Sequence, residues 1–123
     1  GDRLTVFVKD GATGQVITSN TIPVASVNAI LIFGKGGDDV ISAYGVQQRN
    51  SPLEDVFIDG GAGNDRIWGG WGNDILIGGA DNDVIQGNKG NDAIIGGSGA
   101  DELYGQEGTD VFDNDPLDAA VIQ

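Results

Sequence analysis

The chain has 123 residues, which is enough for one domain or for part of one. Its 19 Asp and Glu residues against six Lys and Arg give a formal net charge of -13, so nucleic acids and anionic membranes are not expected partners, whereas cations are. The absence of Cys and His excludes disulfides, thiolate chemistry and most zinc sites, and no apolar run is long enough to span a membrane.

The N-terminal quarter of the chain predicts β-structure. LTVFV at 4–8 alternates apolar and polar residues, KDGATG at 9–14 has the composition of a turn, and QVIT at 15–18 continues as a second strand, so a β-hairpin is predicted. AILIF at 29–33 predicts a buried strand. We expect residues 1–33 to cap the repeat structure that follows, because an open solenoid end exposes apolar core and unpaired backbone groups.

A nine-residue period begins at Gly60 and runs through six consecutive units to Asp113. The first two units read GGAGNDRIW and GGWGNDILI. The sixth residue of every unit is Asp, namely Asp65, Asp74, Asp83, Asp92, Asp101 and Asp110. The eighth is large and apolar, namely Ile67, Leu76, Ile85, Ile94, Leu103 and Phe112. Because many of the 22 glycines keep the same phase, the composition indicates a repeat structure rather than disorder.

Each unit divides into a turn and a very short strand. The six residues rich in Gly, Asn and Asp favour backbone conformations with φ > 0, as turns require. The three residues that follow place one apolar side chain inward between two outward ones. Two units then make one coil of eighteen residues, and strands eighteen residues apart stack at about 4.8 Å. The predicted fold class is therefore all-β, a parallel β-roll of stacked half-turns with an N-terminal β-hairpin cap.

The units resemble the glycine-rich nonapeptide of the RTX (hemolysin-type) calcium-binding repeats, whose pattern is GGxGxDxUx. The clean match covers Gly60–Asp113, and a divergent unit, GKGGDDVIS at Gly34–Ser42, puts Asp39 at the sixth position. Residues 43–55 are expected to form one expanded turn before a strand at 56–58. The resemblance implies three parts: a cap at 1–33, the calcium-binding roll at 34–113, and a C-terminal cap or tail at 114–123.

Calcium suits this spacing for a physical reason. Stacking two coils puts aspartates about 4.8 Å apart, where two carboxylates repel each other by roughly 1 kcal/mol even in water. A column of such carboxylates needs a cation between its members. Calcium takes six to eight oxygen ligands at about 2.3–2.6 Å, so two oxygens on opposite sides of one ion are about 5 Å apart. Glycines let the turn carbonyls complete the shell, whereas turn propensity alone explains Gly and Asn but not an Asp in every unit.

The resemblance also implies a ligand set. In the family, one loop supplies the carbonyls of its second and fourth residues and its Asp, and the loop eighteen residues later supplies its first and third carbonyls and its Asp. On one edge of the roll this gives Gly61, Gly63, Asp65, Gly78, Ala80 and Asp83, and then Gly79, Asp81, Asp83, Gly96, Ser98 and Asp101. On the other edge it gives Gly70, Gly72, Asp74, Gly87, Lys89 and Asp92, and then Asn88, Gly90, Asp92, Gly105, Glu107 and Asp110. A fifth site is expected where the Asp39 loop stacks on the Asp65 loop, with Lys35, Gly37, Asp39, Gly60, Ala62 and Asp65.

The function implied is a module that binds about five calcium ions and folds on binding them. The resemblance adds a setting, in which the module is a segment of a larger bacterial protein exported by type I secretion and folds outside the cell. Asp115 or Asp118 in the C-terminal segment is a candidate for a further, weaker ion, although plain solvated carboxylates are the favoured explanation of both residues. An enzyme is not expected, because calcium accounts for the paired carboxylates and there is no His or Cys for other chemistry.

A calcium-rigidified adhesion or surface-binding module is the alternative function. One outer face is predicted to carry an apolar stripe that could dock a partner, a second copy or a neighbouring domain, consisting of Phe57, Ile75, Ile77, Ala93, Ile95 and Val111. The simpler explanation of this stripe is that short strands favour β-branched residues on both faces. Sugar binding through Trp68, Trp71 and Tyr104 also stays open.

Overall fold

All the elements in the computed structural model are β-strands. The structure describes residues 3–9, 16–23, 30–43, 55–113, 115–118 and 120–122. Twelve strands lie in these ranges: β1 (Arg3–Lys9), β2 (Val16–Pro23), β3 (Ile30–Phe33), β4 (Val40–Ser42), β5 (Val56–Ala62), β6 (Arg66–Trp68), β7 (Ile75–Ala80), β8 (Val84–Lys89), β9 (Ala93–Ser98), β10 (Glu102–Glu107), β11 (Val111–Phe112) and β12 (Ala120–Ile122).

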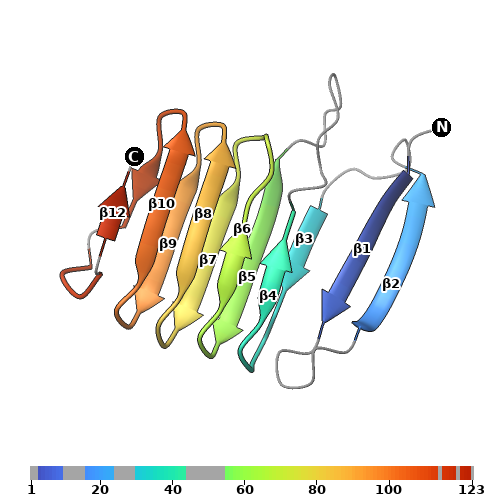
Figure 1. Cartoon of the computed structure of the whole chain (residues 1–123), viewed down its shortest axis with the longest axis horizontal. Helices are drawn as coiled ribbons and strands as arrows, with labels where there is room; N and C mark the ends of the chain where they lie inside the picture. The colour runs from blue at the N-terminus through green and yellow to red at the C-terminus, as the bar shows by residue number, and fades with distance from the viewer. Residues whose placement is uncertain are drawn as a thin grey trace.

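Ten of the strands form two parallel sheets of five strands each. Odd-numbered strands make one sheet in the order β11-β9-β7-β5-β3, and even-numbered strands make the other in the order β12-β10-β8-β6-β4. The chain therefore alternates between the sheets at every half-turn, and successive coils stack along one axis (Figure 1). The predicted fold class, a parallel β-roll, is confirmed.

The register of the roll follows the eighteen-residue coil. Phe57 pairs with Ile75 and Ile75 with Ala93, each step being eighteen residues. At the N-terminal end the step is 26 residues, since Val40 pairs with Arg66. The extra eight residues belong to the expanded turn predicted at 43–55, of which residues 44–54 lie outside the described part of the chain. The insertion therefore lengthens one coil without changing which side chains face inward.

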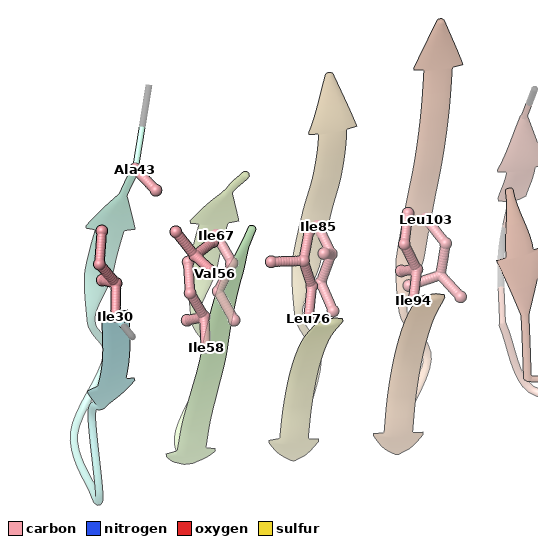
Figure 2. Packing of buried hydrophobic residues seen from close by; sticks show 9 residues of the cluster. All are labelled: Ile30, Ala43, Val56, Ile58, Ile67, Leu76, Ile85, Ile94 and Leu103. Atoms are coloured by element: carbon pink, nitrogen blue, oxygen red, sulfur yellow. The ribbon is translucent and has the colours of Figure 1, made fainter. Parts of the chain in front are cut away.

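The core consists of inward apolar side chains, one from each of β6 to β10 and two, Val56 and Ile58, from β5. Six of these side chains are completely buried: Ile58, Ile67, Leu76, Ile85, Ile94 and Leu103. They form two facing ladders between the sheets, and Ile30, Val56 and Ala43 close the N-terminal part of the cluster (Figure 2). The predicted inward positions are confirmed, and the core is a single layer of side chains on each wall.

Both ends of the roll carry additional strands. β1 and β2 form the predicted antiparallel hairpin, with Leu4 opposite Ile22 and Val8 opposite Thr18, and β1 comes within 8 Å of β4 between Cα atoms (Figure 1). At the other end β12 pairs with β10, again eighteen residues apart. β3 and β12 are thus sheet strands outside the range 34–113, and the functional division of the chain into cap, roll and tail stays a prediction.

Candidate metal sites

Seven glycine-rich loops connect the strands, and each ends in a buried aspartate. We name each loop by that residue: Asp39 (34–39), Asp65 (60–65), Asp74 (69–74), Asp83 (78–83), Asp92 (87–92), Asp101 (96–101) and Asp110 (105–110). Loops Asp39, Asp65, Asp83 and Asp101 form the first edge of the roll, and loops Asp74, Asp92 and Asp110 form the second. None of the seven aspartates is more than 8% exposed. Burying a carboxylate is costly unless a cation or hydrogen-bond donors compensate its charge.

In the six aspartates from Asp65 to Asp110, one carboxylate oxygen accepts a backbone N–H from the previous coil. Asp83 Oδ1 accepts the Asp65 backbone N–H at 2.7 Å, and Asp101 Oδ1 accepts that of Asp83 at 2.8 Å. The same bond joins Asp65 to Asp39, Asp92 to Asp74 and Asp110 to Asp92. These bonds bring the aspartates of each edge together in the predicted order: Asp39–Asp65–Asp83–Asp101 and Asp74–Asp92–Asp110.

The second oxygen points into the loop. The Oδ2 atoms of Asp65, Asp83, Asp92 and Asp101 are buried and accept no hydrogen bond. Each lies beside the first glycine of its own loop, so that a Cβ added to Gly78, for example, would strike Asp83 Oδ2 and lie 2.6 Å from Gly96 O. A glycine at this position leaves room beside an unpartnered carboxylate oxygen, which is the space that a bound ion requires.

Backbone carbonyls surround this space from both coils. The second and fourth residues of six loops have positive φ, including the non-glycine residues Lys35, Asp81, Asn88 and Gln106. This conformation turns their carbonyls toward the next coil, since a Cβ at Gly97 would strike Gly79 O and one at Gly99 would strike Asp81 O. The first carbonyl of each later loop points back, as Gly96 O does toward Gly78.

The third carbonyl of the later loop also points back, but it already accepts a backbone N–H. Ala62 O accepts the Gly37 N–H at 2.8 Å, Ala80 O that of Gly63 at 3.2 Å, and Glu107 O that of Gly90 at 2.9 Å. A carbonyl has two lone pairs, so such an oxygen can accept one hydrogen bond and still face a cation.

Burial perturbs the titration of these carboxylates. It raises the pKa of Asp83 and of Asp92 to about 7, with the backbone hydrogen bond opposing the shift and neighbouring carboxylates adding to it. Burial raises the pKa of Asp65 as well, and that of Asp74 to about 6. A column of charged aspartates is therefore unstable without a proton or a cation on it.

The donor set fits calcium. Every candidate ligand is a carboxylate or carbonyl oxygen, and the loops contain neither sulfur nor imidazole, so the set matches a hard cation. Among the residues that the structure describes, no three acidic side chains converge on one point. Each site would therefore combine the aspartates of two consecutive coils with four backbone carbonyls, as the resemblance implies.

The Asp74 loop differs from the other six. Gly70 and Gly72 lack the positive φ found at the equivalent positions elsewhere, and the Gly70 N–H occupies Asp74 Oδ2 at 2.7 Å. Asp74 Oδ1 accepts the Val56 N–H at 2.8 Å, because Val56 stands where an earlier Asp of this edge would be. Of the predicted ligands, Gly70 and Asp74 are thus engaged with each other rather than arranged like their counterparts.

A second ladder of side chains, missed by the sequence reasoning, runs along the outer rim of the loops. The fifth residue of a loop accepts the backbone N–H of the fifth residue one coil later: Asn64 Oδ1 accepts from Asn82 at 3.1 Å, and Asn82 Oδ1 from Ala100 at 2.8 Å. On the second edge Asn73 accepts from Asn91 and Asn91 from Thr109, both at 2.8 Å. Asp38 and Asp55 begin the two ladders. The sequence feature that could have predicted this ladder is the recurrence of Asn at position five of the units.

The comparison with known families agrees with this geometry. The model of the RTX calcium-binding nonapeptide repeat (4 copies) matches residues 57–85 and 77–112, which together make a little under half of the chain. No curated protein and no solved structure matches the chain. The matched residues include β5 to β11 apart from the first residue of β5, together with the six loops from Asp65 to Asp110. The repeat region of this chain therefore belongs to the family of RTX calcium-binding nonapeptide repeats.

Proposed function

We propose that this chain is a calcium-binding module whose roll folds when the ions bind, and that it works as part of a larger secreted bacterial protein. The observation behind this proposal is the set of unpartnered, buried Oδ2 atoms along the two edges of the roll, on Asp65, Asp83 and Asp101 of the first edge and on Asp92 of the second. Membership of the calcium-binding repeat family supports the choice of ion.

Five ions are proposed, each between two consecutive loops of one edge. They would lie at Asp39–Asp65, Asp65–Asp83 and Asp83–Asp101 on the first edge, and at Asp74–Asp92 and Asp92–Asp110 on the second. The ligands are those implied by the resemblance: the second and fourth carbonyls of the earlier loop, the first and third carbonyls of the later loop, and both aspartates. Gly70 and Gly72 would join this set only after the Asp74 loop adopts the conformation of the others.

The dependence of folding on calcium follows from charge and core size. A net charge of -13 opposes compaction, and in the part of the chain that the structure describes six fully buried apolar side chains provide only a thin core. Five calcium ions would bring about ten positive charges into the roll, and because the loops exist only in the folded chain, the binding free energy contributes directly to folding.

Circular dichroism and isothermal titration calorimetry test this function together. The chain in EDTA is expected to lack the β-sheet spectrum, which calcium should restore with a heat of binding and about five ions per chain. Magnesium at the same concentration is the control, since its demand for octahedral geometry at about 2.1 Å suits these loops poorly. A chain that gives the same spectrum in EDTA and in calcium, without heat of binding, would exclude the proposal.

Secretion explains why folding of the roll would depend on calcium. Extracellular calcium modules have dissociation constants of about 10⁻⁴–10⁻³ M, so such a roll stays unfolded in a calcium-poor cytosol and folds outside the cell. In the described part of the chain no helix is long and apolar enough to cross a membrane. A catalytic role is not proposed for this module. Expression in a bacterial host with and without a type I exporter, followed by assay of the medium, tests the setting.

Adhesion through an outer face is a second candidate, and one observation favours it. The outer surface of the β11-β9-β7-β5-β3 sheet exposes large apolar side chains, including Leu31, Phe33, Ile75, Ile95 and Val111. Sedimentation velocity of the calcium-loaded chain provides the test, with an Ile75→Ser, Ile95→Ser variant as comparison. Self-association that the variant loses supports a contact through this face, whereas a wild-type chain that is monomeric at every concentration excludes contact between copies.

A further inference from the structure

The roll continues for one half-coil beyond the repeats that the family model matches. Asp113 follows β11, and its carboxylate accepts the backbone N–H of Gly96 at 3.1 Å and of Gly97 at 3.4 Å. Further on, β12 pairs with β10 in the same eighteen-residue register as the rest of the sheet. Between these two anchors the structure describes the segment 115–118, and its Asp118 lies close to Asp101, where the next loop of the first edge would stand.

This segment supplies a carboxylate that the nine-residue pattern does not predict. Residue 119, eighteen residues after Asp101, is Ala, and the acidic residue is Asp118 instead. Both carboxylate oxygens of Asp118 have less than 1 Å² exposed and neither accepts a hydrogen bond. Burial raises the pKa of Asp118, and the charges of Asp101 and Asp113 add to this shift. The Asp101 N–H opposes the shift without reaching hydrogen-bond geometry.

The Asp101 loop is already arranged as the lower half of a site. Asp101 is 0% exposed and its Oδ2 accepts no hydrogen bond. Gly97 and Gly99 have the positive φ that, in the Asp83 loop, turns the carbonyls of Gly79 and Asp81 toward the next coil. Two carboxylates with three unpartnered buried oxygens and two such carbonyls thus meet at the C-terminal end of the first edge.

We propose that Asp118 and the Asp101 loop hold one further calcium ion, which closes the C-terminal end of the roll. Its ligands are the Asp118 carboxylate, Asp101 Oδ2 and the carbonyls of Gly97 and Gly99. The inference rests on the proposed calcium binding of the repeat loops, because Asp101 would then belong to two sites. It assigns the C-terminal segment a binding role, in which one ion fastens this segment to the last first-edge loop.

The stoichiometry of calcium binding tests this site. Asp118→Ala should bind one ion fewer than the wild-type chain in equilibrium dialysis. Asp115→Asn is the matched control, since it removes the same charge from the same turn yet keeps an oxygen to accept the Leu117 N–H, which Asp115 Oδ1 accepts at 2.9 Å. The control should bind as many ions as wild type. Equal stoichiometry in wild type and Asp118→Ala overturns this site alone, whereas a wild-type chain that binds no calcium overturns the proposed function as well.

A crystal of the wild-type chain grown in calcium gives an answer independent of any variant. An anomalous difference peak between Asp101 and Asp118, of the same kind as peaks in the repeat loops, supports the site. Peaks in the repeat loops with only water between Asp101 and Asp118 overturn it.

Discussion

The four aspartates with an unpartnered Oδ2 each have two separable roles, because their two oxygens face different partners. Oδ1 holds a backbone N–H of the previous coil, whereas Oδ2 faces the loop interior, as in Asp83 and Asp92. An asparagine keeps an oxygen for the first role and loses the charge needed for the second. Asp→Asn substitutions therefore measure calcium binding with little disturbance of the backbone ladder.

Asp83→Asn is expected to weaken two sites, and Asp110→Asn only one. Asp83 lies between Asp65 and Asp101 in the first edge, while Asp110 is the last aspartate of the second. Loss of one charged ligand should lower affinity by about tenfold per site, or about 1.4 kcal/mol. Calcium titration calorimetry measures this. Equal losses in the two variants would contradict the stacking order of the sites.

The rim ladder predicts a stability effect that is independent of calcium ligands. Asn82→Ala should destabilise the calcium-loaded roll by about 1 kcal/mol, because the Ala100 N–H loses its acceptor. Thr109→Ala is the control, since Thr109 is the last fifth-position residue of its edge in the described part of the chain. Its backbone N–H donates to Asn91, but its side chain accepts no fifth-position N–H from a later coil there. Urea unfolding in saturating calcium compares them. Equal stability of the Asn82→Ala and Thr109→Ala variants would show that the ladder contributes nothing.

At the scale of the loop, the first glycine keeps the ion cavity open. In Gly78→Ala the new Cβ would strike Asp83 Oδ2 and lie 2.6 Å from Gly96 O and 2.8 Å from Asp83 Cγ. Since two of these atoms are proposed ligands, the methyl group should abolish binding between these coils and cost about 1–3 kcal/mol of stability.

Gly36→Ala is the matched control for Gly78→Ala. Its Cβ meets nothing closer than Ala62 O at 3.8 Å, which is an ordinary contact, and Gly36 pairs with Ala62 at the equivalent position one coil later. Its stability should stay within about 0.5 kcal/mol of wild type. Thermal unfolding in calcium measures both variants, and the idea of a glycine-lined cavity fails if Gly78→Ala unfolds at the same temperature as Gly36→Ala.

The sequence predicts the elements of this roll well because one period determines strand, turn and register together. Ile58, Ile67 and Leu76 face inward as expected, and the 26-residue step at Val40 follows from treating residues 43–55 as an insertion. Strands β5 and β7 to β10 are longer than the predicted three residues, since pairing continues into the loops, as Gly79 with Gly97 and Ala80 with Ser98 show.

Two features of the loops could not be predicted from the nine-residue period. The Asp74 loop, GGWGND, fits the pattern closely, yet its Gly70 N–H binds Asp74 Oδ2. Its neighbour one coil earlier is the inserted segment that ends at Val56, so the loop stands beside a coil that breaks the repeat. The period also gives no role to Asp118, which lies one residue away from the expected position, and the sequence offered it, together with Asp115, only as a candidate for a weaker ion. In both cases the neighbouring coil determines the local geometry, and the sequence of a single nine-residue unit does not specify that neighbour.

In the molecule as a whole, the buried negative charge lies at the two edges of the roll, beside a core of only one layer of side chains on each wall. Apolar side chains fill one layer between the sheets, while buried carboxylates line both edges. The free energy of folding therefore depends on whatever neutralises these edges, and two species can do so, namely calcium and the proton. Protons should raise the stability of the calcium-free roll, but they should lower its affinity for calcium.

Acid should stabilise the calcium-free roll. The folded-state pKa of Asp83 and of Asp92 is about 7, above the ordinary value of 3.8, so the folded chain binds protons more tightly than the unfolded chain does. Stability should therefore rise as the pH falls from about 7 and level off below about 3.8. Calcium affinity should change in the opposite direction, because protons compete with the ion for the same oxygens.

Circular dichroism in EDTA between pH 8 and pH 4 measures the first effect as a gain of β-sheet signal, because the calcium-free chain is expected to be unfolded near neutral pH. Calcium titration over the same range measures the second effect. An Asp83→Asn, Asp92→Asn variant is the control, because it lacks two of the titrating groups and should show a shallower rise in stability as the pH falls. If the calcium-free wild-type chain instead gains no β-sheet signal from pH 7 to pH 4, the buried carboxylates do not limit folding. Calcium would then have to stabilise the roll chiefly by ordering the loops and not by neutralising charge.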